Sequence, residues 1–286
     1  MKNRDVQPVA LSTALLTALA MLAFAANSLL CRAALGGARI DAATFTIVRL
    51  ASGAMVLAFL VMRRNGPGLR AGSWLSALAL LAYAAPFSFA YLRVGAGVGA
   101  LVLFGAVQAT MIGVDLHRGR RPQWTEWVGL LLALAGLAWL TIPGAKSPDL
   151  TGVMCMAGAG VAWGVYSLRG RGRDPLATTA GNFVRSVVLA LPLVAVALEA
   201  GEAVHASGVW LAVASGALAS GCGYAIWYAA LPGLTPTRAG VVQLTVPVLA
   251  ALGGELWLGE AFTLQLAVAA ALVLSGVGLA MTRPRA

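Results

Sequence analysis

The amino-acid sequence predicts an all-α integral membrane protein whose ten transmembrane helices form two inverted repeats of five. Three observations lead to this fold class: a very apolar composition, ten apolar segments of spanning length, and a similarity between the two halves of the chain. Of the 286 residues, 60% are apolar before glycine is counted and only 10% are charged. Because a soluble domain keeps about a quarter of its residues charged, this composition excludes a soluble globular domain and a disordered chain.

The ten apolar segments follow one another with short connections. Each is long enough to cross ~30 Å of hydrocarbon, and they cover residues 9–31, 43–62, 73–92, 95–114, 124–142, 150–168, 176–198, 206–231, 236–258 and 262–281. Ten spans of ~20 residues leave ~86 residues for nine connections and two ends. Connections this short hold no extramembrane domain, so we expect the chemistry of the protein to lie within the helix bundle.

The basic residues indicate which way the spans run. The formal charge of +10 would suggest nucleic-acid binding in a soluble protein, but here Lys and Arg occupy short clusters between apolar runs. Lys and Arg concentrate in cytoplasmic loops. With the N-terminus inside, the outer segments hold four basic residues, and the inner segments hold fourteen: Lys2, Arg4, Arg63, Arg64, Arg70, Arg118, Arg120, Arg121, Arg169, Arg171, Arg173, Arg238, Arg283 and Arg285. Both termini are therefore expected to be cytoplasmic.

The N-terminus also resembles a secretory signal peptide. Lys2 and Arg4 precede an apolar run that ends at the small-residue sequence Ala23-Phe24-Ala25, which is typical of a cleavage site. We expect the first span to be retained, because the internal repeat needs it as a partner.

The two halves of the chain, residues 1–145 and 146–286, resemble each other. A shift of 140 residues aligns three glycines with glycines, a shift of 139 aligns Phe24-Ala25-Ala26-Asn27 with Trp163-Gly164-Val165-Tyr166, and a shift of 136 aligns Arg49 with Arg185. Each half holds five spans, an odd number, so the second copy enters the membrane inverted. Inverted repeats are typical of secondary transporters, which bind substrate near the bilayer midplane at the repeat interface.

Several short motifs have the spacing found in one transporter superfamily. The second half contains Ala239-Gly240-Val241, Pro247-Val248, Leu258-Gly259-Glu260 and Gly276, the sixth span contains Trp163-Gly164, and each half has an Arg early in its second helix. Over essentially its whole length the chain resembles the drug/metabolite transporter superfamily in its ten-helix form. The resemblance implies a small-molecule transporter, commonly an exporter of metabolites or amino acids in a bacterial cytoplasmic membrane.

The two repeats also differ at positions that matter for this resemblance. The first has Gly119-Arg120 where the second has Gly259-Glu260, and Gly129 of the first corresponds to Ala269. Any role of Glu260 is therefore confined to one half.

Aromatic and amide side chains deep in the spans are the candidate substrate contacts. Aromatic residues four apart share a helix face, and they either pack between helices or form the wall of a cavity for an organic solute. Trp163, beside Gly164 in a Gly-x-x-x-Gly stretch that permits close helix approach, is the first candidate. The complete set of expected substrate-binding residues is Trp163, Tyr83, Gln108, Asn27, Tyr166, Tyr224, Trp227 and Gln243.

Arg49 and Arg185 are the charged residues well inside spans, where each costs at least ~2.5 kcal/mol unless it is solvated or paired. Either they hold a substrate carboxylate, or they tie helices together or act in gating. Because both copies keep the Arg whereas one substrate needs only one, the sequence favours the structural or gating role.

Pro86 and Pro247, with Pro192, interrupt spans and are expected to be hinges or static kinks.

All ten acidic residues lie in loops, termini or the outermost turns of spans. Proton-driven transporters usually carry an acid or His within the membrane, so we expect transport driven by the substrate gradient.

The leading hypothesis is a monomeric secondary transporter that exports small amphipathic metabolites, most plausibly amino acids with apolar or aromatic side chains. The alternative is a proton-coupled exporter of lipophilic cations. The expected partners are a small-molecule substrate and the lipid bilayer, not nucleic acid.

The remaining sequence features argue against other protein classes. The three cysteines, Cys31, Cys155 and Cys222, lie in separate apolar runs, which favours neither disulfides nor a metal cluster. The sequence contains no Walker-A loop and no grouping of His, Asp and Glu typical of a catalytic site. We therefore expect no enzyme activity, no cofactor, no metal and no ATPase subunit.

Overall fold

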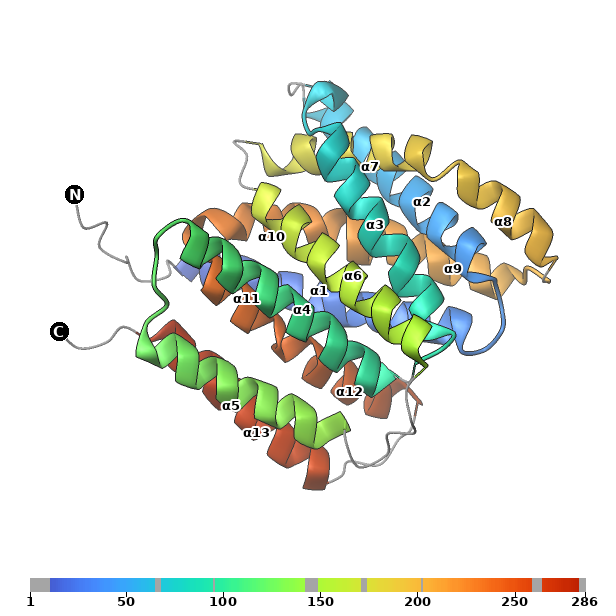
Figure 1. Cartoon of the computed structure of the whole chain (residues 1–286). Helices are drawn as coiled ribbons and strands as arrows, with labels where there is room; N and C mark the ends of the chain where they lie inside the picture. Colours follow the sequence, from blue (N-terminus) through green and yellow to red (C-terminus); the bar gives the residue numbers. More distant parts are fainter. Residues whose placement is uncertain are drawn as a thin grey trace.

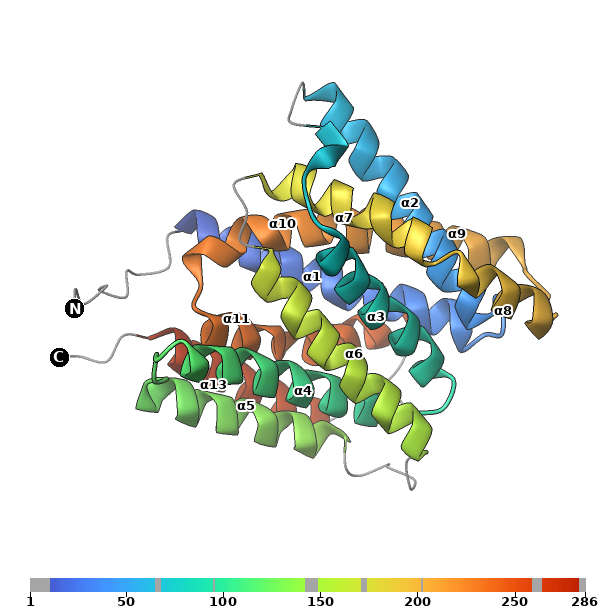
Figure 2. The ribbon, with the colours of Figure 1, turned by 45° about the horizontal axis from the view of Figure 1, so that its top comes forward.

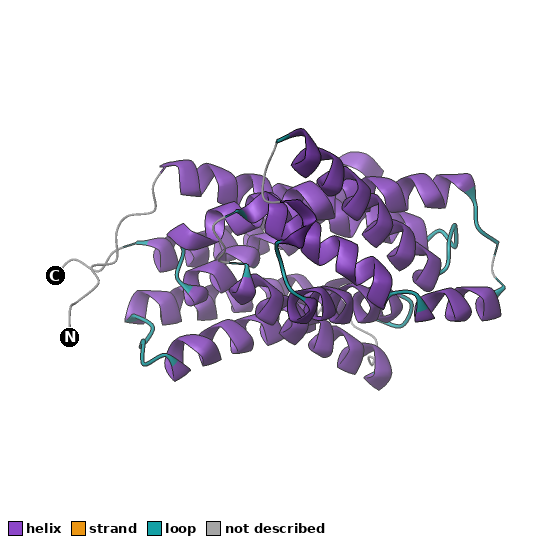
Figure 3. Ribbon diagram, turned by 90° about the horizontal axis from the view of Figure 1, so that it is seen from above, coloured by secondary structure: helices purple, strands orange, loops and turns teal. Residues whose placement is uncertain are grey.

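The computed structural model describes residues 11–64, 68–94, 96–141, 149–170, 174–201, 203–258 and 264–282, and every regular element in these ranges is a helix (Figures 1 and 3). The first half contains α1 (Leu11–Leu35), α2 (Ala42–Arg63), α3 (Trp74–Tyr91), α4 (Ala96–His117) and α5 (Trp124–Thr141). The second half contains α6 (Leu150–Arg169), α7 (Pro175–Leu189), α8 (Pro192–Ala200), α9 (Ala206–Ala214), α10 (Gly223–Ala230), α11 (Pro236–Gln243), α12 (Thr245–Leu258) and α13 (Leu264–Met281).

Polar residues in the loops begin many of these helices. The first N–H groups of a helix have no partner within it, and a side-chain oxygen of the preceding residue satisfies one of them. Asp41 accepts from Thr44 N at the start of α2, and Asp174 accepts from Ala177 N at the start of α7. Ser73, Asp149 and Thr235 cap α3, α6 and α11 in the same way. Several of the few acids in the chain thus have a local role at a helix end.

Five of the described helical segments are long and apolar enough to cross a bilayer, and the pair α7–α8 makes a sixth if it forms one span. The expected seventh span, 176–198, is not one straight helix: α7 and α8 meet at an angle of 56°. Pro192 begins α8, and because its nitrogen carries no hydrogen it cannot continue the hydrogen-bond ladder of α7. The count of ten spans remains a prediction.

The expected eighth and ninth spans are also irregular. The eighth, Ala206–Gly233, is one long segment in which a π-helix, Ser215–Cys222, separates α9 from α10. The ninth is divided at Leu244 into α11 and α12. Both irregular segments adjoin the centre of the bundle, where the candidate site lies.

The helices pack as a bundle with α1 running through its middle (Figures 1 and 2). On one side α5 lies along α13, in the most extensive helix contact of the bundle, and on the other α2 lies along α7. Between them, α6 packs on both α3 and α4, and α1 contacts α10 and α12. This arrangement brings α1, α3, α6, α10 and the α11–α12 junction together around one central volume.

Small residues allow α5 and α13 to approach closely. A side chain at Gly129 would meet the carbonyl of Gly276, and one at Gly276 would meet the carbonyl of Gly129. A side chain at Gly136 would likewise meet atoms of α13, among them the carbonyl of Ala269. Transmembrane helices associate through such close backbone packing, because lipid gives no hydrophobic driving force between them.

We expect Gly276→Ala to destabilise the fold by about 1–3 kcal/mol, because the added methyl group overpacks a contact made by backbone atoms. Gly278→Ala on the same helix is the matched control, since a Cβ there has no neighbour within 4 Å and alanine favours helix. Thermal unfolding in detergent measures the difference. Equal unfolding temperatures for the two variants would contradict the packing role of Gly276.

Candidate functional site

A cluster of aromatic rings occupies the centre of the bundle. Trp163 of α6 lies 4.9 Å from Tyr83 of α3 and 4.7 Å from Tyr224 of α10, measured between ring centroids. Phe24 of α1 packs edge-on against Trp163 at 5.2 Å and against Tyr224 at 5.6 Å. Such edge and tilted geometries are favourable for aromatic pairs. Four helices therefore meet through these four rings.

The close approach of α4 helps to position Trp163. On either side of this residue, Gly160 and Gly164 leave no room for a side chain, because a Cβ would meet the Leu103 carbonyl at the first and Thr110 at the second. The expected role of the Gly-x-x-x-Gly stretch in helix packing is confirmed by these contacts.

The rings enclose a small cavity of about 30 Å³. Its lining residues come from α1, α3, α4, α6, α10, α11 and α12 and are Phe24, Asn27, Ser28, Tyr83, Phe87, Leu103, Phe104, Trp163, Tyr224, Gln243 and Val246. One water molecule needs ~10–15 Å³ of such space, so the cavity holds about two waters. In this conformation the cavity is too small for an organic solute, and binding one requires the helices to separate.

Amide groups tie the aromatic wall to the irregular helices. Trp163 Nε1 donates to Gln243 Oε1 at 2.5 Å, and Gln243 Nε2 donates to the Ala239 carbonyl at 2.7 Å. On the other side, Asn27 Oδ1 accepts from the hydroxyls of Ser215 at 2.7 Å and Ser220 at 3.2 Å. These serines are five residues apart, and the π-helix places residues i and i+5 one above the other. The π-helix thus lets both serines face Asn27.

Arg49 lies directly behind this wall. Its side chain is 1% exposed, and its Nε donates to the Ser220 hydroxyl at 2.8 Å. Its Nη2 donates to the hydroxyl of Tyr224 at 2.6 Å and, more weakly, to that of Tyr83 at 3.5 Å. The guanidinium carbon also lies 5.4 Å from the centre of the Tyr83 ring, within the range of a cation–π contact. The positive charge is therefore next to the cavity but separated from it by two tyrosines.

Five of the expected substrate contacts line the cavity: Asn27, Tyr83, Trp163, Tyr224 and Gln243. The other three lie outside it. Tyr166 stacks on Trp163 with ring centroids 5.7 Å apart, and Trp227 donates to the Ser167 hydroxyl. Gln108 of α4 is 3% exposed and packs against Gly240 of α11, with no hydrogen-bond partner for its amide in the described part of the chain.

The two aligned arginines have different surroundings. Arg185 Nη1 donates to the carbonyls of Ala71 and Gly181, both at 2.8 Å, and Nη2 donates to the Arg70 carbonyl at 3.1 Å. Arg185 therefore joins α7 to the loop before α3, whereas Arg49 bonds to side-chain hydroxyls at the centre. Arg49 and Arg185 therefore align in sequence but do not make equivalent contacts.

Pro86 lies inside α3 and Pro247 is the third residue of α12. Pro247 therefore lies just after the division between α11 and α12, not in the middle of a continuous helix. Pro86 lies between two residues that line the cavity, Tyr83 and Phe87.

Sequence reasoning missed Phe24 and Ser220 as parts of the site. Phe24 is the position that aligns with Trp163 in the internal repeat, and the two rings are in contact. That alignment is the signal that would have identified it. Ser220 has no comparable signal, because its position against Arg49 depends on the π-helix.

A second polar cluster lies at the other end of α11. Arg120, in the connection between α4 and α5, contacts Asp115 at 2.6 Å and Glu126 at 2.8 Å. Asp115 Oδ2 accepts from Thr237 N and Oγ1 at the start of α11, while Arg238 Nε lies 3.5 Å from Glu126. Asp115 and Glu126 are 2% and 1% exposed. These acids, which lie near the ends of α4 and α5, are therefore buried ion partners and not solvated residues.

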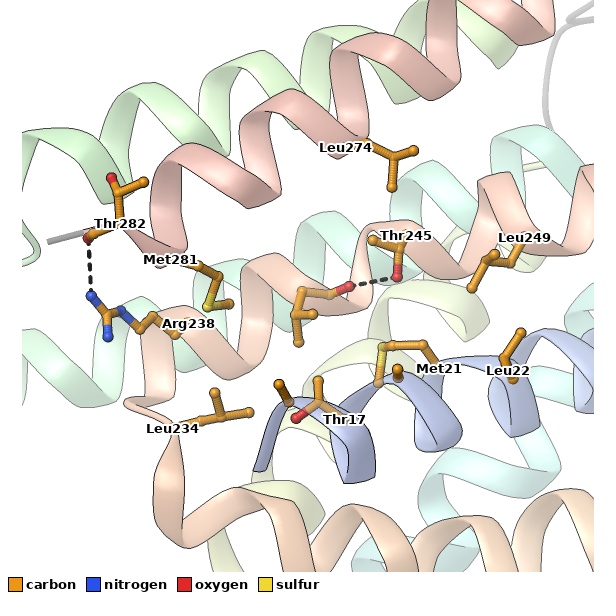
Figure 4. A pocket seen from close by; sticks show the side chains of 13 residues that line it. Thr17, Met21, Leu22, Leu234, Arg238, Thr245, Leu249, Leu274, Met281 and Thr282 are labelled. Atoms are coloured by element: carbon orange, nitrogen blue, oxygen red, sulfur yellow. Dashed lines mark hydrogen bonds between the residues drawn. The ribbon is translucent and has the colours of Figure 1, made fainter. Parts of the chain in front are cut away.

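A larger groove of about 870 Å³ runs beside the cavity (Figure 4). Side chains from α1, α11, α12 and α13 converge on it, and Arg238, whose Nη2 donates to the Thr282 carbonyl, lies at its polar end. Val242 and Thr245 line the groove, whereas the adjacent residues Gln243 and Val246 line the cavity. The α11–α12 junction is therefore the partition between the two spaces.

Comparisons with known proteins agree with this picture. Residues 150–282 match the model of the EamA-like transporter family. An uncharacterized protein of Pseudomonas aeruginosa is 52% identical over 269 residues, which is 93% of each chain. The threonine/homoserine exporter RhtA of Escherichia coli is 33% identical over 177 residues, covering 60% of this chain and 59% of the exporter. An uncharacterized transporter of Bacillus subtilis, YwfM, is 26% identical over 74% of this chain and 73% of its own length.

A solved crystal structure shares the fold. It has a TM-score of 0.79 with 21% sequence identity and covers 94% of this chain and 96% of its own. At this level of identity the likeness concerns the fold alone.

We expect Glu126→Gln to destabilise the protein by about 3 kcal/mol, because it removes a buried negative charge that pairs with Arg120 and lies 3.5 Å from Arg238. Arg93→Gln is the control: the Arg93–Asp149 pair is 3.8 Å apart with both side chains about half exposed, and such surface pairs contribute about 0–1 kcal/mol. Chemical unfolding in detergent measures both. A loss no larger in Glu126→Gln than in Arg93→Gln would show that the cluster is not a structural tie.

Proposed function

We propose that this chain, which belongs to the EamA-like transporter family of the drug/metabolite transporter superfamily, is a secondary transporter that exports small amphipathic metabolites from the bacterial cytoplasm. We take amino acids with apolar or aromatic side chains as its substrates. The observation that carries the proposal is the buried cavity, whose wall combines aromatic rings with the amides Asn27 and Gln243. Ligand sites of this kind bind an apolar body and orient it through a few polar groups.

The similarity to RhtA supports amino acids as the substrate class, since that relative is named as an exporter of threonine and homoserine. The size of the aromatic wall supports larger and less polar side chains in this chain. Phe24, Tyr83, Trp163 and Tyr224 offer ring faces and edges to a solute, and aromatic contacts of this type contribute about 0.5–1.5 kcal/mol each beyond area burial.

Alternating access is proposed to use the partition at the α11–α12 junction. In the proposed orientation, with both termini cytoplasmic and ten spans in two inverted halves (1–145 and 146–286), the polar end of the groove faces the cytoplasm. A substrate would enter the groove and reach the cavity when the junction moves. The reciprocal contacts of α5 and α13 through Gly129 and Gly276 support such a two-fold arrangement. The unit is proposed to be a monomer in the inner membrane.

The charges around the cavity support transport driven by the substrate gradient. None of the residues that line the cavity is acidic, and the buried acids Asp115 and Glu126 are paired with Arg120. The alternative, a proton-coupled exporter of lipophilic cations, is disfavoured because the charge beside the cavity is the positive Arg49. Glu260, the family position considered above, lies outside the described residues.

We expect purified protein in liposomes to show saturable counterflow of labelled Trp, Phe or Met, with Thr and a lipophilic cation as comparison solutes. Trp163→Ala should raise KM about tenfold, because it removes the central aromatic contact, equivalent to ~1.4 kcal/mol of binding. Trp210→Ala is the matched control, since Trp210 is 71% exposed on α9 and should leave KM unchanged.

Two outcomes would contradict this proposal. Counterflow of the lipophilic cation without counterflow of any amino acid would favour the drug-exporter alternative. Amino-acid flux that occurs only under an imposed pH gradient would replace gradient-driven export by proton exchange.

A further inference from the structure

Arg49 has an environment that differs from that of a structural arginine. A structural tie satisfies the guanidinium with fixed acceptors, as the backbone carbonyls do for Arg185. All the hydrogen-bond partners of Arg49 are hydroxyls, and its Nη1 has no partner in the described part of the chain. No salt bridge with a carboxylate involves Arg49 among the described residues.

This environment leaves a positive charge uncompensated. Arginine stays protonated in proteins, and a buried hydrogen-bond donor without a partner costs about 1–3 kcal/mol. Hydroxyl groups accept from the guanidinium but carry no negative charge. The site is therefore incomplete in electrostatic terms, and an anion that enters it would supply both the missing acceptor and the missing charge.

The two tyrosines connect this charge to the cavity. Each hydroxyl that accepts a hydrogen bond from Arg49 keeps its own hydrogen to donate, and Tyr83 and Tyr224 both line the cavity. The Arg49–Tyr83 contact of 3.5 Å is at the outer limit of a hydrogen bond, so it is the weaker of the two and the easier to open. An anion in the cavity can therefore accept from hydroxyls that are themselves bonded to the Arg49 guanidinium.

We propose that Arg49, with Tyr83 and Tyr224, binds the carboxylate of the exported substrate. A guanidinium and a carboxylate have matching planar geometry, and the charged hydrogen bonds between them are about twice as strong as neutral ones. The aromatic wall then receives the apolar part of the same molecule. This inference rests on the proposed function, because it assigns the carboxylate of an amino-acid substrate to a particular group.

Four ligands with one ring separate the contributions of the two charged groups of an amino acid. Phenylalanine has a carboxylate and an ammonium group, 3-phenylpropionate has only the carboxylate, phenethylamine has only the ammonium group, and phenylalaninamide has lost the carboxylate charge. We expect phenylalanine and 3-phenylpropionate to raise the unfolding temperature of the purified protein, and phenethylamine and phenylalaninamide to bind at least tenfold more weakly.

Variants on α10 provide a matched pair. Tyr224→Phe removes the hydroxyl that accepts from Arg49, whereas Tyr228→Phe removes an equally buried hydroxyl four residues later, which donates to the Tyr166 carbonyl outside the cavity. We expect Tyr224→Phe and Arg49→Lys to raise the Kd of 3-phenylpropionate about tenfold and Tyr228→Phe to leave it unchanged. Because Arg49→Lys alters a buried charge, the folding of this variant is checked by gel filtration. If Arg49→Lys misfolds, Tyr224→Phe still tests the site.

The outcomes distinguish this inference from the proposed function. Equal binding of phenethylamine and 3-phenylpropionate, no binding of either carboxylate, or equal effects of Tyr224→Phe and Tyr228→Phe would overturn the assignment of Arg49. Binding of 3-phenylpropionate that depends on Tyr224, without counterflow of any amino acid, would support the carboxylate site and overturn amino-acid export. Counterflow of phenylalanine and phenylalaninamide at equal rates would support amino-acid export and overturn the carboxylate site.

Discussion

Burial of the Arg49 guanidinium is the constraint on which the centre of the bundle depends. A charge in this position needs hydrogen-bond partners, because lipid supplies none and, among the described residues, no carboxylate forms a salt bridge with it. Ser220 is one partner, and it reaches Arg49 from the π-helix Ser215–Cys222. Gly216 allows this approach, since a Cβ there would meet the Arg49 carbonyl. The same π-helix orients Ser215 and Ser220 toward Asn27, so one irregular turn connects α1 and α2 through polar side chains.

Two of the polar clusters of the described chain lie at different levels of the bundle. One level is the central set around Arg49, made of neutral hydroxyls and amides, and the other is the ionic cluster of Asp115, Arg120, Glu126 and Arg238 at the end of the helices. Aromatic and small residues occupy the volume between them. Tight helix contacts at Gly129, Gly160 and Gly276 pack the helices of the bundle closely against one another.

Much of the fold follows from local sequence properties. Apolar runs of spanning length predicted helices throughout, the resemblance to the drug/metabolite transporter superfamily is confirmed, and Trp163 lies at the centre of the aromatic cluster. The features that could not be predicted depend on contacts distant in sequence. The π-helix, the division at Leu244 and the burial of Asp115 and Glu126 each require a partner from another helix. For the same reason, Gln108, Tyr166 and Trp227 match the expected residue types but lie outside the cavity.

Helix α11 has a consequence for how the two polar levels communicate. This helix is eight residues long, with Thr237 bonded to Asp115 at its start and Gln243 bonded to Trp163 at its end. A single short helix therefore belongs to both the ionic cluster and the wall of the cavity. Coupling free energy between two sites is reciprocal. If opening of the ionic cluster changes the affinity of the cavity for substrate, then substrate in the cavity must change the equilibrium for opening of the cluster by the same factor.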